Sequence, residues 1–102
     1  GHMTTEGRTT LFREVARVLR QGGRFIFCDF SEKDFRAGQG TEIEDHTFLR
    51  GNRIITHYFT EEEVRALSET LRVCNLTTVC RTMTVRVKSY TRAEVVASFA
   101  RI

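Results

Sequence analysis

The sequence contains no proline and no tryptophan, and it has no apolar run long enough to cross a membrane. A transmembrane helix needs about 20 consecutive apolar residues, so we expect a protein without a membrane span. No segment has the composition of a signal peptide, a proline-rich linker or a repeat. With 102 residues, the chain is long enough for one small domain.

Cysteine is scarce, and no two cysteines have the spacing of a C-x-x-C pair. The three are Cys28, Cys74 and Cys80. An odd number without that spacing argues against a disulfide framework and against a zinc site, so we expect no bound metal. Cys28 lies in an apolar run, and we interpret it as a small buried hydrophobic residue. Unpaired cysteines are typical of a reducing compartment, and we expect the protein to be cytoplasmic.

The net charge is small and positive, +3 with a pI near 9.1. Such a balance is compatible with an anionic partner such as RNA. It is equally typical of a mildly basic surface that only meets solvent. The charge by itself therefore selects no function.

The central stretch of the chain, residues 18–30, has the pattern of a helix end, a tight turn and a short strand. Apolar residues recur at helical spacing over residues 10–21, which predicts an amphipathic helix. Gly22 suits the left-handed conformation that closes a helix, because it has no Cβ. Residues 25–28 are all apolar, which predicts a strand over 24–29 that is covered on both faces. Asp29 then lies at the carboxyl end of that strand, where open α/β sheets bind ligands.

The first residues differ in character from the rest. Gly1-His2-Met3 is typical of a cloning remnant left after tag removal. Residues 4–9 are polar, and we expect them to be disordered. We therefore divide the chain into a start at 1–9 and a folded part at 10–102.

Two β-prone runs, 46–50 and 53–59, flank Gly51-Asn52 and predict a β-hairpin. The polar, glycine-bearing residues 31–45 before them are expected to form a long loop. After the hairpin, Thr60 and Glu63 have the spacing of a capping box, which starts a helix over residues 60–71. The three consecutive glutamates there are explained by the cap and the helix dipole rather than by catalysis.

The end of the chain predicts two strands, over residues 76–87 and 94–102, with a polar turn at 88–92 between them. His46 and His57 lie on the strands of the predicted hairpin. The spacing offers them no further metal ligands, so we expect hydrogen-bonded or solvated histidines.

Two sets of motifs resemble known methyltransferases. The run RVLRQGGRF at 17–25 resembles the "RVLKPGGR" turn of class I S-adenosylmethionine-dependent methyltransferases, with Gln21 where proline is usual. The runs FCDF at 27–30, FLRGN at 48–52 and HYFTEE at 57–62 resemble the RNA 3-methylcytosine methyltransferases of the methyltransferase-like family. That family's pattern runs approximately "FRDY", "FYVRGDGT" and "YFFT-x-E". This sequence departs from it at Cys28, where the family has arginine, and at Phe30, where it has tyrosine.

The resemblance implies that the chain is the carboxy-terminal half of such a domain. It implies an α/β, partial class I (Rossmann-like) fold. We expect a three-stranded mixed sheet with the last strand in the middle, two covering helices and a β-hairpin insertion. The glycine-rich loop that binds S-adenosylmethionine belongs to the other half. We therefore expect no cofactor-binding residue in this chain, and no catalysis by the chain alone.

The function that the resemblance implies is part of a methyltransferase acting on RNA, with tRNA cytosine as the first expectation. One alternative is a non-catalytic module that binds RNA or a partner methyltransferase subunit. Another is a methyltransferase half that acts on a small molecule or a protein.

Five residues are candidates for contact with the substrate: Asp29, Phe30, Arg50, Arg53 and Tyr58. Asp29 borders the pocket expected at the strand end, although it would serve equally as an ion-paired acid. Phe30 can stack on an unpaired base or pack in the core. Arg50 and Arg53 flank the hairpin turn, where they either contact phosphate or meet only solvent. Tyr58 is expected to pack with its hydroxyl at a polar rim.

The strand at 24–29 has one edge without a partner in this chain. An apolar, unpaired edge favours pairing with a second chain. The sequence therefore predicts a homodimer through Phe25–Cys28.

Overall fold

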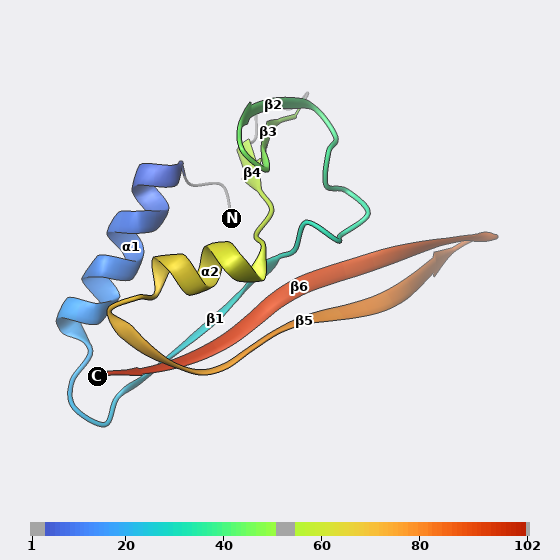
Figure 1. Ribbon diagram of the computed structural model, residues 1–102. Helices are drawn as coiled ribbons and strands as arrows, with labels where there is room; N and C mark the ends of the chain where they lie inside the picture. The colour runs from blue at the N-terminus through green and yellow to red at the C-terminus, as the bar shows by residue number, and fades with distance from the viewer. Residues whose placement is uncertain (1–3, 51–54, 102) are drawn as a thin grey trace.

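The computed structural model describes residues 4–50 and 55–101, which form two helices and two small sheets (Figure 1). This confirms an α/β protein. Neither described helix is long and apolar enough to cross a lipid bilayer. The elements, in chain order, are α1 (Thr5–Val18), β1 (Arg24–Phe30), β2 (Thr41–Glu44), β3 (Thr47–Leu49), β4 (Ile55–His57), α2 (Glu61–Leu67), β5 (Leu71–Val85) and β6 (Lys88–Arg101).

The main sheet has the strand order β1-β6-β5, so the last strand lies between the other two, as predicted. Both pairings are antiparallel, with Ala97 opposite Phe27 of β1 on one side and opposite Leu76 of β5 on the other. The expectation of a mixed sheet is therefore wrong for these neighbours. β1 and β5 run in the same direction, but β6 separates them. A Rossmann-like arrangement stays a prediction.

Helix α1 begins earlier than the sequence indicated. Thr4 is its N-cap, with the side-chain oxygen accepting a hydrogen bond from Gly7 N at 3.3 Å, whereas the sequence predicted a helix over residues 10–21. The described residues of the supposedly disordered start, 4–9, therefore belong to the helix and its cap. The helix ends at Val18, and Gly22 follows with a φ of +80° in the turn before β1. Gly22 has the predicted left-handed conformation, but it makes the turn into the strand rather than closing the helix.

The core lies between the two helices and one face of the main sheet (Figure 1). Phe12 of α1 is its centre, with ring-centroid distances of 5.5 Å to Phe27 and 6.0 Å to Phe99. The buried residues of this cluster are Phe12, Phe27, Phe59, Val64, Leu71, Val95, Ala97 and Phe99. Because residues of β1 and β6 enter it at alternate positions, only one face of the sheet is covered.

The other face of β1 is open in the described chain, so the expectation of a strand covered on both faces is wrong. Ile26 is 64% exposed, and Cys28 is exposed rather than buried. The Cys28 thiol donates to Glu94 Oε2 at 3.0 Å. That hydrogen bond, followed by desolvation and the negative charge of Glu94, raises the pKa of Cys28 to about 11. β1 is also an edge strand, and the homodimer through Phe25–Cys28 stays a prediction.

The second sheet has the order β2-β3-β4. Phe48 of β3 pairs with Thr56 of β4, which confirms the hairpin, while its expected turn at Gly51-Asn52 lies outside the described residues. Strand β2 lies in the stretch that was predicted to be a loop. The sequence did not indicate this strand, because its four residues show no alternation of apolar and polar side chains. Gly40, with a φ of +92°, lets the chain pass close to β3: a Cβ there would lie 2.5 Å from Leu49 O.

The last three elements keep the predicted order but have different bounds. Thr60 caps α2, accepting a hydrogen bond from Glu63 N at 3.0 Å, as predicted. The helix ends at Leu67, and β5 begins after the three turn residues 68–70. β5 and β6 form a hairpin of 15 and 14 residues. Its turn falls at Arg86 and Val87 rather than over 88–92, with Arg86 at a φ of +58°.

Replacing Phe12 by alanine tests the core. Phe12→Ala removes a ring that is 1% exposed, and we expect a loss of about 3–5 kcal/mol in the free energy of unfolding. Val18→Ala on the same helix removes a side chain that is 64% exposed and should cost less than about 0.5 kcal/mol. Urea denaturation followed by circular dichroism measures both, and equal losses would contradict the assignment of the core.

Candidate functional site at the end of β1

The backbone at the end of β1 is joined to the segment that leads into α2. Ser31 forms a parallel bridge with Phe59. Phe59 N donates to Phe30 O at 2.7 Å, and Glu32 N donates to Phe59 O at 3.0 Å. The exit of β1 therefore lies beside the first turn of α2.

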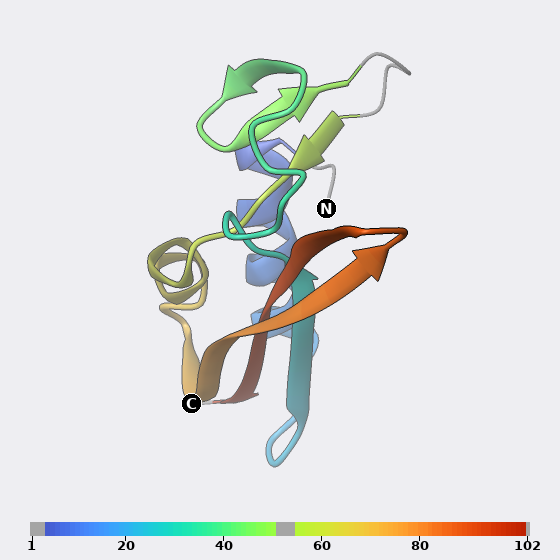
Figure 2. The same ribbon diagram turned by 90° about the vertical axis from the view of Figure 1, so that its right-hand side faces the viewer.

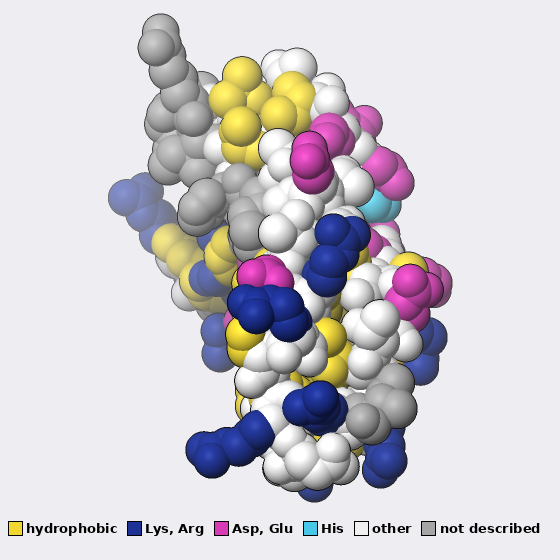
Figure 3. Space-filling model, turned by 90° about the vertical axis from the view of Figure 1, so that its left-hand side faces the viewer, with side chains coloured by type: hydrophobic (Ala, Val, Ile, Leu, Met, Phe, Trp, Pro, Cys, Tyr) yellow, Lys and Arg dark blue, Asp and Glu magenta, His cyan; other side chains and the backbone are white. Residues whose placement is uncertain are grey.

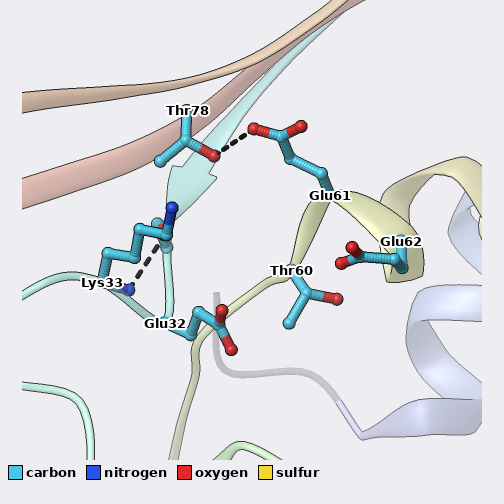
Figure 4. Close-up of a pocket in the computed structure, with 7 residues that line it drawn as sticks. Glu32, Lys33, Thr60, Glu61, Glu62 and Thr78 are labelled. Carbon is cyan, nitrogen blue, oxygen red and sulfur yellow. Dashed lines mark hydrogen bonds between the residues drawn. The ribbon is translucent and has the colours of Figure 1, made fainter.

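A polar pocket of about 160 Å³ opens between these segments and β5 (Figure 4). Within it, Thr78 Oγ1 donates to Glu61 Oε2 at 2.5 Å, and Lys33 N donates to Ser31 Oγ at 3.1 Å. The lining residues are Ser31, Glu32, Lys33, Thr60, Glu61, Glu62 and Thr78. Three carboxylates and three hydroxyls beside a single ammonium group suit ligand groups that donate hydrogen bonds, such as amines and hydroxyls. The same charges disfavour a phosphate.

Asp34 organises the loop next to this pocket, and its carboxylate is buried. It accepts hydrogen bonds from Ala93 N at 3.0 Å and from Arg36 Nε at 2.9 Å. Arg92 Nε lies 3.4 Å from its other side. Burial acts to raise the pKa of Asp34, but the Arg36 hydrogen bond and the N–H groups of Ala93 and Arg36 outweigh it, so the pKa lies below its usual value.

Arg36 also lies over two aromatic rings, one at the end of β1 and one in the loop that follows it. Its guanidinium carbon lies 4.4 Å from the centre of the Phe30 ring and 5.7 Å from that of Phe35. The Phe30 ring in turn lies 6.1 Å from the ring of Tyr58. The ion pair with Asp34 fixes the guanidinium in this position.

The structure brings together three of the five residues that the sequence singled out. Asp29 is half-buried, with Oδ1 accepting from Phe30 N at 2.7 Å, and Phe30 and Tyr58 lie against each other. Tyr58 is 1% exposed and packs between aromatic rings. Arg50 donates to Gln39 Oε1 at 2.9 Å, and Arg53 lies outside the described residues.

A second buried polar cluster links the small sheet to both helices. His57 Nδ1 lies 2.6 Å from Thr47 Oγ1, and His57 Nε2 lies 2.6 Å from Glu63 Oε1. Arg8 Nε donates to Glu63 Oε2 at 3.1 Å. His57 is therefore a hydrogen-bonded buried histidine, as predicted, whereas Glu63 does more than the capping assigned to it.

Sequence reasoning missed Asp34, Arg36 and Arg8. The first two lie in a stretch interpreted as a loop, where an acid and a base two residues apart around Phe35 were the available signal. Arg8 lies in the supposed disordered start, and no local pattern marks it. Its partner is Glu63, far along the chain.

The residues present do not fit S-adenosylmethionine as a whole. The pocket at the end of β1 and a neighbouring one hold about 160 and 250 Å³, below the ~300 Å³ usual for small-molecule sites. The glycines at 22–23 and 38–40 come before strands rather than between a strand and a helix. The described residues therefore form no complete site for that cofactor. Among residues 4–50 and 55–101, no three His, Cys, Asp or Glu side chains gather as a metal site would need.

Replacing Asp34 by asparagine tests the electrostatics of the loop. Asp34→Asn leaves Arg36 and Arg92 without their acid, and at neutral pH we expect a loss of about 2–4 kcal/mol in the free energy of unfolding. The folded-state pKa of Asp34 is lowered, so its contribution is complete above the unfolded-state pKa of about 3.9 and is lost as the pH falls through the folded-state pKa.

The difference between wild type and Asp34→Asn should therefore shrink between pH 7 and about pH 2.5 in urea unfolding experiments. Asp45→Asn, at a carboxylate that is 93% exposed, is the matched control and should change stability little. A difference that stays constant with pH would contradict the assignment.

No protein-family model matches the chain. A curated relative, the tRNA N(3)-methylcytidine methyltransferase Mettl2 of Drosophila melanogaster, is 37% identical over 54 residues. That match covers 50% of this chain and 17% of the relative, so the chain spans only a small part of that protein. It confirms the resemblance that the motifs indicated: the chain is similar to part of a tRNA methylcytidine methyltransferase.

Proposed function

We propose that this chain is part of an S-adenosylmethionine-dependent methyltransferase that acts on RNA, with a cytosine of tRNA as its substrate. The observation that carries the proposal is the similarity to the tRNA N(3)-methylcytidine methyltransferase, 37% over 54 residues. The cofactor, when bound, supplies the methyl group. The residues of this chain would contribute on the side of the acceptor.

The acceptor side is assigned to the end of β1. Methyl transfer depends mainly on holding the two reactants in line, so groups that orient the acceptor are what this part must provide. Asp29 and the carboxylates of the polar pocket can accept hydrogen bonds from amino and hydroxyl groups, which a nucleoside presents. These acceptors support a nucleoside rather than a phosphate as the group held there.

In this proposal Arg36, and not Phe30 as the sequence predicted, is the residue on which the base stacks. One face of the Phe30 ring is already covered by the guanidinium at 4.4 Å. A guanidinium plane held by an aspartate is itself a surface on which bases stack. The side chain of Arg36 is 25% exposed, so its outer part is accessible.

A cytoplasmic location belongs to the same proposal. The three free cysteines support a reducing compartment.

Deleting the gene and measuring modified nucleosides tests the proposal. We expect 3-methylcytidine in total tRNA to fall, as measured by mass spectrometry of nuclease digests. The gene carrying Asp29→Asn should fail to restore it, because the change removes the negative charge and turns one accepting oxygen into an NH2 donor. Glu14→Gln removes one carboxylate from the exposed face of α1 and should restore it fully.

Unchanged 3-methylcytidine after deletion would contradict the proposal. A fall in a different methylated nucleoside would support an RNA methyltransferase but show that its substrate base is not this cytosine. Equal rescue by Asp29→Asn and Glu14→Gln would remove Asp29 from the site.

A further inference from the structure

One hairpin of the chain carries basic side chains and no acidic ones. Residues 70–93 contain five Lys and Arg side chains and no Asp or Glu. The remainder of the chain holds eleven basic residues against thirteen acidic ones, so its net charge is −2. The segment itself therefore has a net charge of +5.

The same segment forms an arm that projects from the body of the molecule. Figures 1 and 2 show the β5–β6 hairpin running away from both helices, and the molecule measures 49 Å along its longest axis against 19 Å along its shortest. Around the turn, Val85 is 49% exposed and Val87 is 96% exposed. Residues in this distal half add little to the core, so packing does not explain its length or its sequence.

The register places Arg81, Arg92 and Lys88 on one face of the arm. Arg81 lies opposite Arg92, and Lys88 lies opposite Val85. Directly opposed residues of an antiparallel pair point to the same side of the sheet, and like charges in that position are unfavourable. Arg92 reaches Asp34 at 3.4 Å, and Arg81 reaches Glu94 at 3.4 Å.

Arg86 and Lys88, at the turn, are exposed and take part in none of the ion pairs found within the described residues. Arg81 is 68% exposed, so its pairing with Glu94 is weak and easily exchanged. The distal half of the arm thus presents three accessible cations, Arg81, Arg86 and Lys88, on a two-stranded support. On the face that α1 presents, acidic and basic side chains lie together in the upper part of the view, and basic side chains alone appear at its lower end (Figure 3).

We propose that the distal half of the β5–β6 hairpin, residues 79–90, binds the phosphodiester backbone of RNA. Arginine and lysine on such an arm neutralise successive phosphates without reading the bases, which positions a nucleic acid relative to a site elsewhere. The choice of RNA over other polyanions rests on the proposed function. The carboxylate-lined pocket and the basic arm would then bind different parts of the RNA. The pocket disfavours phosphate, whereas the arm attracts it.

Titrating the full chain into fluorescein-labelled total tRNA, without cofactor, tests this assignment by fluorescence anisotropy at about 50–200 mM KCl. The double variant Arg86→Gln/Lys88→Gln should weaken binding by roughly tenfold. It should also reduce the slope of log Kd against log salt by about 0.7–0.9 for each lost phosphate contact. The matched control is Arg13→Gln/Arg20→Gln, which removes the same charge from exposed positions in and just after α1. It should bind within about twofold of wild type and with an unchanged slope.

Equal losses in the two double variants would overturn the proposal, because the charge alone and not the arm would then matter. Absence of tRNA binding by the wild-type chain would also overturn it. If the hairpin-dependent binding to phosphatidylserine vesicles were stronger than the binding to tRNA, the partner of the arm would be a membrane surface and not RNA, and the proposal would be wrong.

The measurement separates this inference from the proposed function, because it uses neither cofactor nor methyl transfer. Hairpin-dependent tRNA binding together with unchanged 3-methylcytidine on gene deletion would support RNA binding by the arm and contradict the proposed methyltransferase function. Loss of 3-methylcytidine on deletion together with normal tRNA binding by Arg86→Gln/Lys88→Gln would support the methyltransferase function and contradict RNA binding by the arm.

Discussion

The ion pair between the buried Arg8 and the partly buried Glu63 is the interaction on which the arrangement of the molecule depends. Arg8 is 2% exposed, and a guanidinium buried to that degree requires a partner. Glu63 meets that need with one oxygen and uses the other for His57, while its backbone N–H completes the cap of α2. One carboxylate thereby joins the start of α1, the first turn of α2 and the last residue of β4.

The consequences reach the end of β1. Because His57 is fixed, the following residues Tyr58 and Phe59 run alongside Phe30 and Ser31, where they supply backbone partners to the end of the strand. The polar pocket and the Arg36 stack both border this junction. The candidate site is therefore held by two carboxylates, the partly buried Glu63 on one side and the buried Asp34 on the other, rather than by a large apolar core.

Much of the fold is readable in the sequence because it is encoded locally. The Gly-Gly turn, the apolar run of β1, the β3–β4 pair and the capping box of α2 each lie within about ten residues, and each was found. The start of α1 was missed because the burial of Arg8 depends on Glu63, which no local pattern reveals. Cys28 was misjudged because an apolar run does not tell whether one or both faces of a strand are covered.

The candidate site shows the same limit. Asp29 and Phe30 were found from their place at a strand end, a topological rule that needs no contacts. Asp34 and Arg36 acquire their roles only when the loop folds back on β6 and meets Ala93 and Arg92. The length of the β5–β6 arm was underestimated, because its strands are held by pairing with each other and not by a burial pattern of alternating apolar and polar residues.

A double-mutant cycle on Arg8 and Glu63 tests the dependence on their ion pair most directly. Arg8→Met and Glu63→Gln, made singly and together, are compared with wild type by urea unfolding. We predict that each single change costs about 2–4 kcal/mol and that the double variant is more stable than the sum of the two losses by at least about 1 kcal/mol, since it leaves no buried charge unpaired. Losses that add without coupling would show that the two side chains stabilise the protein independently, and the account of a single carboxylate joining three elements would be wrong.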